Sequence, residues 1–171
     1  TGVGVCVVED GRPLGAGPFG GGILGGQVPI GPTDPGLLDA GDWLDTAGRT
    51  GTIEARCRAQ ALVAQAELRG GAWPDARAVV DAARAGDVRA LDAVAGYRAD
   101  VARALASLAH AHAPDRLVVG GGLAASDSLV LRGLEPAVNA QLSFGLRVGV
   151  FGAVLGSGAA LAGLGVLLGA G

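Results

Sequence analysis

The apolar residues of this chain follow a helical period through its middle and form short continuous runs on either side. Between residues 87 and 112 they recur at spacings of three, four and seven positions, at Leu91, Val94, Val101, Leu105 and Leu108. This periodicity predicts one long amphipathic helix, which Pro114 ends. Two more helices are predicted over residues 52–69, with Thr52 as N-cap, and over residues 75–86.

Short apolar runs elsewhere predict strands. Residues 3–8 are nearly continuous and rich in valine, which is typical of a buried strand. Asp10-Gly11 is a strong hairpin signal, so residues 13–17 should return as an edge strand containing Pro13. Further strands are predicted at residues 27–30, 117–119 and 146–151.

The remaining segments complete the predicted architecture. Residues 15–36 are crowded with glycine and proline and should be mostly loop. Helices are predicted at residues 126–142, where Pro136 should kink or divide the helix, and at residues 154–168. A hairpin followed by alternating helices and strands predicts an α/β fold with a mixed sheet flanked by helices.

Composition restricts the function classes. The chain has 171 residues, which suits one domain or one lobe of a larger protein, and 50% of them are hydrophobic. Every basic residue is an arginine, the formal net charge is −3, and no basic cluster occurs. This argues against nucleic-acid binding through this segment. Because the chain starts at Thr1 and has no Met, we interpret it as part of a longer protein.

Cysteine usage and hydropathy suggest a cytoplasmic protein. Cys6 and Cys57 have no Cys-x-x-Cys partner, so they are predicted to be two buried small apolar residues, with a disulfide as the alternative. Residues 148–171 carry no charge and are long enough to span a bilayer. Gly152 divides them into a short strand and a helix, and glycine is costly in a helix, so we expect no membrane span.

The segment Leu-Val-Val-Gly-Gly-Gly-Leu at residues 117–123 is the most informative for function. An apolar run ends in three glycines ahead of a predicted helix. Glycine has no Cβ, so this backbone can approach a flat ligand such as a nucleotide base. The alternative is a tight strand-to-helix turn with no ligand.

Three segments, taken in order, resemble a known family. Thr1-Gly-Val-Gly leads the hairpin, Gly51-Thr-Ile-Glu-Ala opens a helix, and the long helix ends in Pro114-Asp-Arg-Leu-Val-Val-Gly-Gly-Gly. This order resembles the ROK family, the sugar kinases and sugar-responsive repressors of the actin–hexokinase superfamily. The resemblance implies a ribonuclease H-like α/β fold. It also implies that residues 1–171 form the C-terminal lobe, with an N-terminal lobe and any DNA-binding module outside them.

The resemblance also implies binding residues. Thr1 and Gly2 match a phosphate-binding turn, and Gly120, Gly121 and Gly122 match the turn beneath the adenosine. Glu54 matches the glutamate that accepts hydrogen bonds from a sugar hydroxyl, a role that suits a carboxylate. Two alternatives stay open: a capped strand start at Thr1, and a Glu54 that only favours the helix dipole.

Departures from the family pattern are equally informative. The family's Glu-x-Gly-His becomes Leu24-Gly25-Gly26-Gln27. Leu24 cannot accept a hydrogen bond, whereas Gln27 can still form one with a hydroxyl. The family's zinc loop should lie within residues 30–51, which contain no Cys or His, so we expect no zinc. His110 and His112, two positions apart, are expected to have surface or helix-end roles.

These features lead to three hypotheses for function. The first is a sugar-sensing transcriptional regulator or pseudo-kinase lobe, a homodimer with a small sugar as ligand. The second is an ATP-dependent sugar kinase, using ATP with Mg²⁺, whose catalytic Asp would precede Thr1; no residue of this chain is nominated as catalytic. The third is a non-catalytic dimerisation lobe, with residues 52–69 and 87–112 pairing with a second copy. A helix-turn-helix upstream of Thr1 would favour the regulator, and a strand followed by Asn-Asp would favour the kinase.

Overall fold

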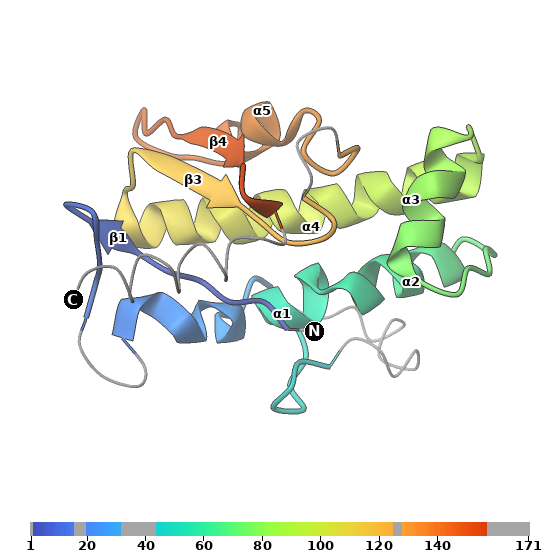
Figure 1. Ribbon diagram of the computed structural model, residues 1–171, viewed down its shortest axis with the longest axis horizontal. Coiled ribbons are helices and arrows are strands. Elements are labelled where there is room, and N and C mark those ends of the chain that lie inside the picture. The colour runs from blue at the N-terminus through green and yellow to red at the C-terminus, as the bar shows by residue number, and fades with distance from the viewer. Residues whose placement is uncertain (1, 16–19, 32–43, 125–127, 157–171) are drawn as a thin grey trace.

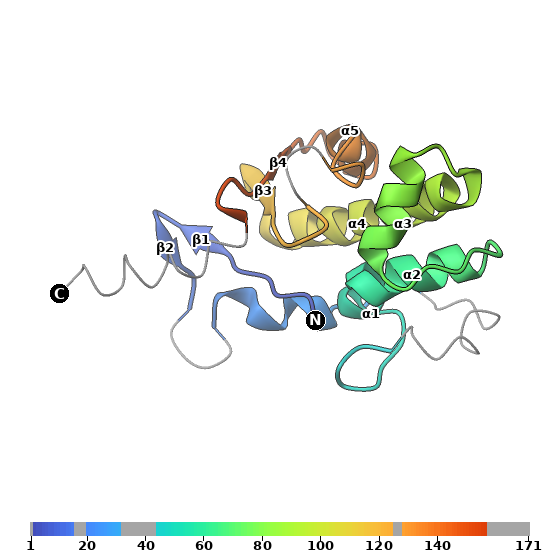
Figure 2. The same cartoon turned by 45° about the vertical axis from the view of Figure 1, so that its right-hand side comes forward.

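A single long helix organises the molecule. The computed structural model describes residues 2–15, 20–31, 44–124 and 128–156, and in it helix α4 (Val88–His112) lies between two layers (Figure 1). Helices α1 and α2 and the 3₁₀ helix η1 lie on one side, while β3, β4 and α5 lie on the other, as a turned view confirms (Figure 2). The Asp87 side chain caps α4 by accepting from Arg89 N and Ala90 N. The predicted helix over residues 87–112 is confirmed.

Small side chains let the other helices approach α4 closely. Helices α1 (Ile53–Cys57), α2 (Ala59–Glu67) and α3 (Ala76–Arg84) all contact it. Their shared core is rich in alanine, with Leu62 and Val79 among its largest fully buried side chains. Thr52 caps α1 and the carboxylate of Asp75 caps α3, so both predicted helix starts are confirmed.

The predicted helix over residues 52–69 is wrong in one respect, because it is broken at Arg58. This residue has extended geometry, with φ −73° and ψ 163°, and separates α1 from α2. On α4, the Tyr97 hydroxyl donates to the Cys57 carbonyl at the break. The break therefore coincides with a contact between residues distant in sequence, which local periodicity does not encode.

Strands β1, β2 and β4 are shorter than predicted, β3 is one residue longer, and the strands form two small sheets in the described residues. β1 (Val8–Glu9) and β2 (Arg12–Pro13) are an antiparallel pair around the predicted turn, and β3 (Arg116–Val119) and β4 (Gly149–Gly152) are a parallel pair. Positive φ values of 50° and 75° at Asp10 and Gly11 suit this turn. The predicted α/β class is confirmed, but these strands do not join into one mixed sheet.

Residues 3–8 were predicted as a buried strand, and this is wrong. Val8 is 59% exposed and Val3 is only half-buried. Cys6 is exposed, Cys57 is half-buried, and both are free thiols. The buried position predicted for Cys6 is therefore also wrong: the segment alternates between half-buried and exposed side chains, so only one face contacts the core.

Proline and glycine shape the remaining elements. Helix α5 (Leu134–Asn139) begins only two residues before Pro136, so the proline lies in the first turn, where its missing N–H has no partner to lose. The loop predicted at residues 15–36 contains the 3₁₀ helix η1 (Gly20–Gln27). The predicted strand at residues 27–30 is reduced to a bridge between Pro29 and Thr52.

Of the helix predicted at residues 154–168, residues 157–168 lie outside the residues that the structure describes. Within the described residues no helix is long and apolar enough to cross a bilayer.

Candidate functional site

A buried carboxylate lies at the start of α1. Glu54 is in the first helical turn and is only 4% exposed. Its Oε2 accepts from Gln27 Nε2 at 2.7 Å and from Thr46 Oγ1 at 3.3 Å, and its Oε1 accepts from the Thr46 backbone N–H at 3.1 Å. These three neutral donors offset much of the cost of burying the charge.

Gln27 is held from both ends of its amide. Its Nε2 donates to Glu54, and its Oε1 accepts from an Arg49 guanidinium nitrogen. Because both ends have defined partners, the orientation of the amide is determined by the network. The structure thus brings together the two predicted sugar-binding residues.

Close backbone contacts bring η1 and the N-terminal segment together beside Glu54. A Cβ on Gly25 would lie 2.6 Å from the Val5 Cβ, and one on Gly26 would lie 2.2 Å from the Val3 carbonyl oxygen. Neither position has room for a side chain. The two glycines between Leu24 and Gln27 therefore set the spacing of the site.

Asp45 organises the loop that covers Glu54. Its side chain has no exposed surface and accepts from the backbone N–H groups of Ala47 and Arg49 at 2.9 and 2.8 Å and from Thr52 Oγ1 at 3.1 Å. Arg49 Nε lies 3.2 Å from its carboxylate. Burial alone would raise the pKa of Asp45, but these hydrogen bonds and the Arg49 charge outweigh it and lower the pKa below its ordinary value of 3.8.

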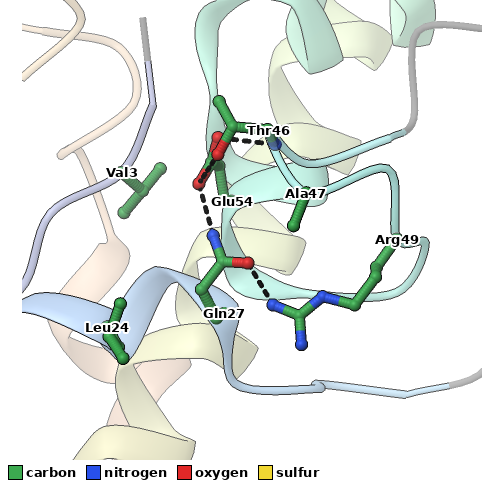
Figure 3. A pocket seen from close by; sticks show the side chains of 7 residues that line it. All are labelled: Val3, Leu24, Gln27, Thr46, Ala47, Arg49 and Glu54. Atoms are coloured by element: carbon green, nitrogen blue, oxygen red, sulfur yellow. Dashed lines mark hydrogen bonds between the residues drawn. The ribbon is translucent and has the colours of Figure 1, made fainter.

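An open cavity of about 750 Å³ lies over this cluster (Figure 3). Seven residues line it: Val3, Leu24, Gln27, Thr46, Ala47, Arg49 and Glu54. Leu24 is 53% exposed, so it lies on the cavity wall and does not belong to the core. Gly2 also lies at Glu54, since a Cβ there would be 3.1 Å from Oε1.

The residues predicted to bind a nucleotide do not all lie at this cavity. Gly120, Gly121 and Gly122 follow β3, are exposed, and do not line the cavity. Gly121 has φ +106°, which favours glycine, and no atom lies within 4 Å of a Cβ built there. Thr1 lies outside the described residues. A nucleotide at this glycine turn stays a prediction, as does the alternative of a turn without a ligand.

Sequence reasoning missed three residues of the site, namely Asp45, Thr46 and Arg49. The available signal was an Asp followed three positions later by Gly48, a turn pattern in which an Asp accepts backbone N–H groups. Nothing local indicated that this turn would lie over Glu54.

Other polar groups lie away from the cavity. His110 is exposed at the end of α4 and accepts from the Ser143 backbone N–H at 3.1 Å. Burial and, secondarily, the charge of Asp100 raise the pKa of Cys57 to about 12, so this thiol is protonated near neutral pH. Among the residues that the structure describes, no three His, Cys, Asp or Glu side chains gather as metal ligands.

The chain thus folds as an α/β lobe with a buried carboxylate beside an open cavity. The sequence model of the ROK family matches residues 1–169, and the chain belongs to this family. No curated protein sequence matches it significantly.

Solved ROK structures have the same fold. A ROK family glucokinase from Streptomyces griseus, in complex with glucose and AMPPNP, matches 98% of this chain with a TM-score of 0.79 and 26% identity. A ROK hexokinase from Thermus thermophilus also matches 98%, with a TM-score of 0.74 and 30% identity. The chain covers only 57% and 54% of these two proteins. A ROK family protein from Streptococcus pneumoniae in complex with sucrose has 18% identity and a TM-score of 0.72, and shows the fold alone.

Proposed function

We propose that this lobe binds a small sugar through Glu54 and Gln27. The observation that carries this proposal is the pair's position on the wall of an open cavity, with Glu54 itself buried. A carboxylate has about four acceptor positions, and protein donors to Glu54 use three of them. The remaining acceptor position of Glu54 suits a sugar hydroxyl, which would donate to it while Gln27 and Thr46 hold the carboxylate in place.

Within this proposal, the lobe belongs to a sugar-sensing regulator or a pseudo-kinase. Leu24 supports this, because a hydroxyl facing an aliphatic side chain gains no hydrogen bond from it. A regulator needs only differential sugar affinity between two conformations and no group transfer. The site keeps one acidic acceptor, which suffices for binding.

The alternative is an ATP-dependent sugar kinase, and one contact favours it. Gly2, the proposed phosphate-binding residue, lies directly against Glu54, the proposed sugar-binding residue. Phosphoryl transfer requires such proximity of phosphate and hydroxyl. The exposed turn at Gly120–Gly122 leaves room for a flat adenine, and ATP with Mg²⁺ would supply the phosphoryl group when bound.

One experiment separates these functions in the full-length protein that carries this lobe. Titration calorimetry with glucose, N-acetylglucosamine and ATP measures binding, and a coupled assay measures ADP formation in the presence of each sugar. The regulator or pseudo-kinase predicts sugar binding without sugar-dependent ADP formation, whereas the kinase predicts both. Absence of any binding would contradict both functions and leave a structural lobe.

We also propose that the lobe forms a homodimer. Leu68, the C-cap residue of α2, and Leu91, in the first turn of α4, are 46% and 41% exposed. Apolar side chains of this size on two adjoining helices can contact a second copy. Light scattering of the full-length protein should give twice the monomer mass, and a monomer mass at high concentration would contradict it.

A further inference from the structure

The two sides of the cavity differ in chemistry. Val3 and Leu24 lie on one side, whereas Gln27, Thr46 and Glu54 face one another on the other (Figure 3). The polar side is already linked by hydrogen bonds into one network with Arg49. A ligand in this cavity therefore meets hydrogen-bonding groups in one direction and aliphatic surface in the other.

The two η1 residues that follow Leu24 add no side chain to the aliphatic side of the cavity. The two positions after Leu24 are glycines, and the packing against Val3 and Val5 leaves no space for larger residues there. Leu24 lines the cavity and is 53% exposed in total, so it has apolar area available for burial by a ligand. A ligand hydroxyl placed against it would lose water and gain no side-chain acceptor.

We propose that the ligand is a sugar in which an apolar group replaces one hydroxyl and packs against Leu24 and Val3. The group is a deoxy carbon or the methyl of an N-acyl substituent, which share the property of burying carbon where a hydroxyl would be unpaired. This inference rests on the proposed sugar-binding function and specifies its ligand class. It makes Leu24 a specificity-determining residue.

Calorimetric titration of the full-length protein with glucose, 2-deoxyglucose, 6-deoxyglucose and N-acetylglucosamine tests the inference. We expect at least one of the three modified sugars to bind about ten-fold more tightly than glucose, because it buries carbon on Leu24 and leaves no hydroxyl unpaired. Tighter binding of a deoxyglucose would identify the apolar group as a deoxy carbon, and tighter binding of N-acetylglucosamine would identify it as an N-acyl methyl.

Variants assign the preference to Leu24. Leu24→Glu should remove or reverse the preference, because the new carboxylate accepts from a hydroxyl, and Leu24→Ala should reduce it through the loss of apolar area. The matched control is Leu14→Glu after β2, an exposed leucine outside the cavity and outside the proposed dimer surface, which should leave the preference unchanged.

Two results would overturn the inference while the proposed function stands. They are glucose binding at least as tightly as all three modified sugars, and a preference that persists in both Leu24 variants. Absence of binding by all four sugars would overturn the proposed function together with this inference.

Discussion

The helical core and the candidate site are held together in different ways. Helices α2, α3 and α4 pack through alanine, valine and leucine side chains that are almost fully buried. The site instead joins the N-terminal segment, η1, the Asp45 loop and the start of α1 through polar groups. The partners of Glu54 are 8 and 27 positions away in the sequence.

This difference separates stability from binding. Removing core side chains leaves cavities and lowers the free energy of unfolding of the whole lobe. Removing a polar partner in the site leaves a buried group without its hydrogen bond, at a local cost. Variants in the core should therefore change mainly the free energy of unfolding, whereas variants in the site should also change ligand affinity.

The largest effect is expected in the helical core. Leu62→Ala should lower the free energy of unfolding by about 2–5 kcal/mol, because Leu62, on α2, is fully buried in the helical core. Urea denaturation followed by circular dichroism measures this change. Leu14→Ala, at an exposed position after β2, is the control and should cost less than about 1 kcal/mol. Equal costs for the two variants would contradict the burial pattern.

Asp45→Ala should have the next largest effect and should act on both properties. The substitution removes the carboxylate that accepts hydrogen bonds from the backbone N–H groups of Ala47 and Arg49 and from the Thr52 hydroxyl. We therefore expect the free energy of unfolding to fall by about 2–3 kcal/mol. Because Thr46 then no longer holds Glu54, sugar affinity should also fall. Denaturation and calorimetry measure the two effects, and a destabilised variant with unchanged affinity would show that the loop does not position Glu54.

Glu54→Ala should act mainly on binding. A sugar hydroxyl that loses its acceptor should weaken binding by about 1–3 kcal/mol, which is roughly 5- to 150-fold in Kd. Calorimetry measures the change, with circular dichroism to check the fold. Glu67→Ala, an exposed carboxylate at the end of α2, is the control. If the natural protein, Glu54→Ala and Glu67→Ala bind the sugar with the same affinity, Glu54 is not part of a sugar site.

The smallest effect is a pH dependence from Asp45. Its pKa is lowered in the folded state, so it adds stability above the pKa of the unfolded chain, about 3.9, and loses it as the pH falls through the folded-state pKa. Asp45→Asn lacks this contribution. Its free energy of unfolding should fall less steeply than that of the natural protein between about pH 5 and pH 2, and parallel curves would refute the role of Asp45.

Local patterns predicted the elements whose causes are local. The period of the apolar residues and the Thr52 cap located α4 and the starts of α1 and α3 within a residue or two. The turn at Asp10-Gly11 and the strand before Gly120 were found for the same reason. The break at Arg58 was missed, because the contact made there by Tyr97 comes from a residue 40 positions away from Cys57.

The sequence by itself determined the α/β class, the family and the identity of Glu54 and Gln27 as candidate ligand contacts. Only the tertiary structure decided that Asp45, Thr46 and Arg49 surround these two residues and that Leu24 lies on the cavity wall. The reason is physical: helix periodicity and capping act over a few residues, whereas a buried carboxylate takes whichever donors the packed chain brings to it.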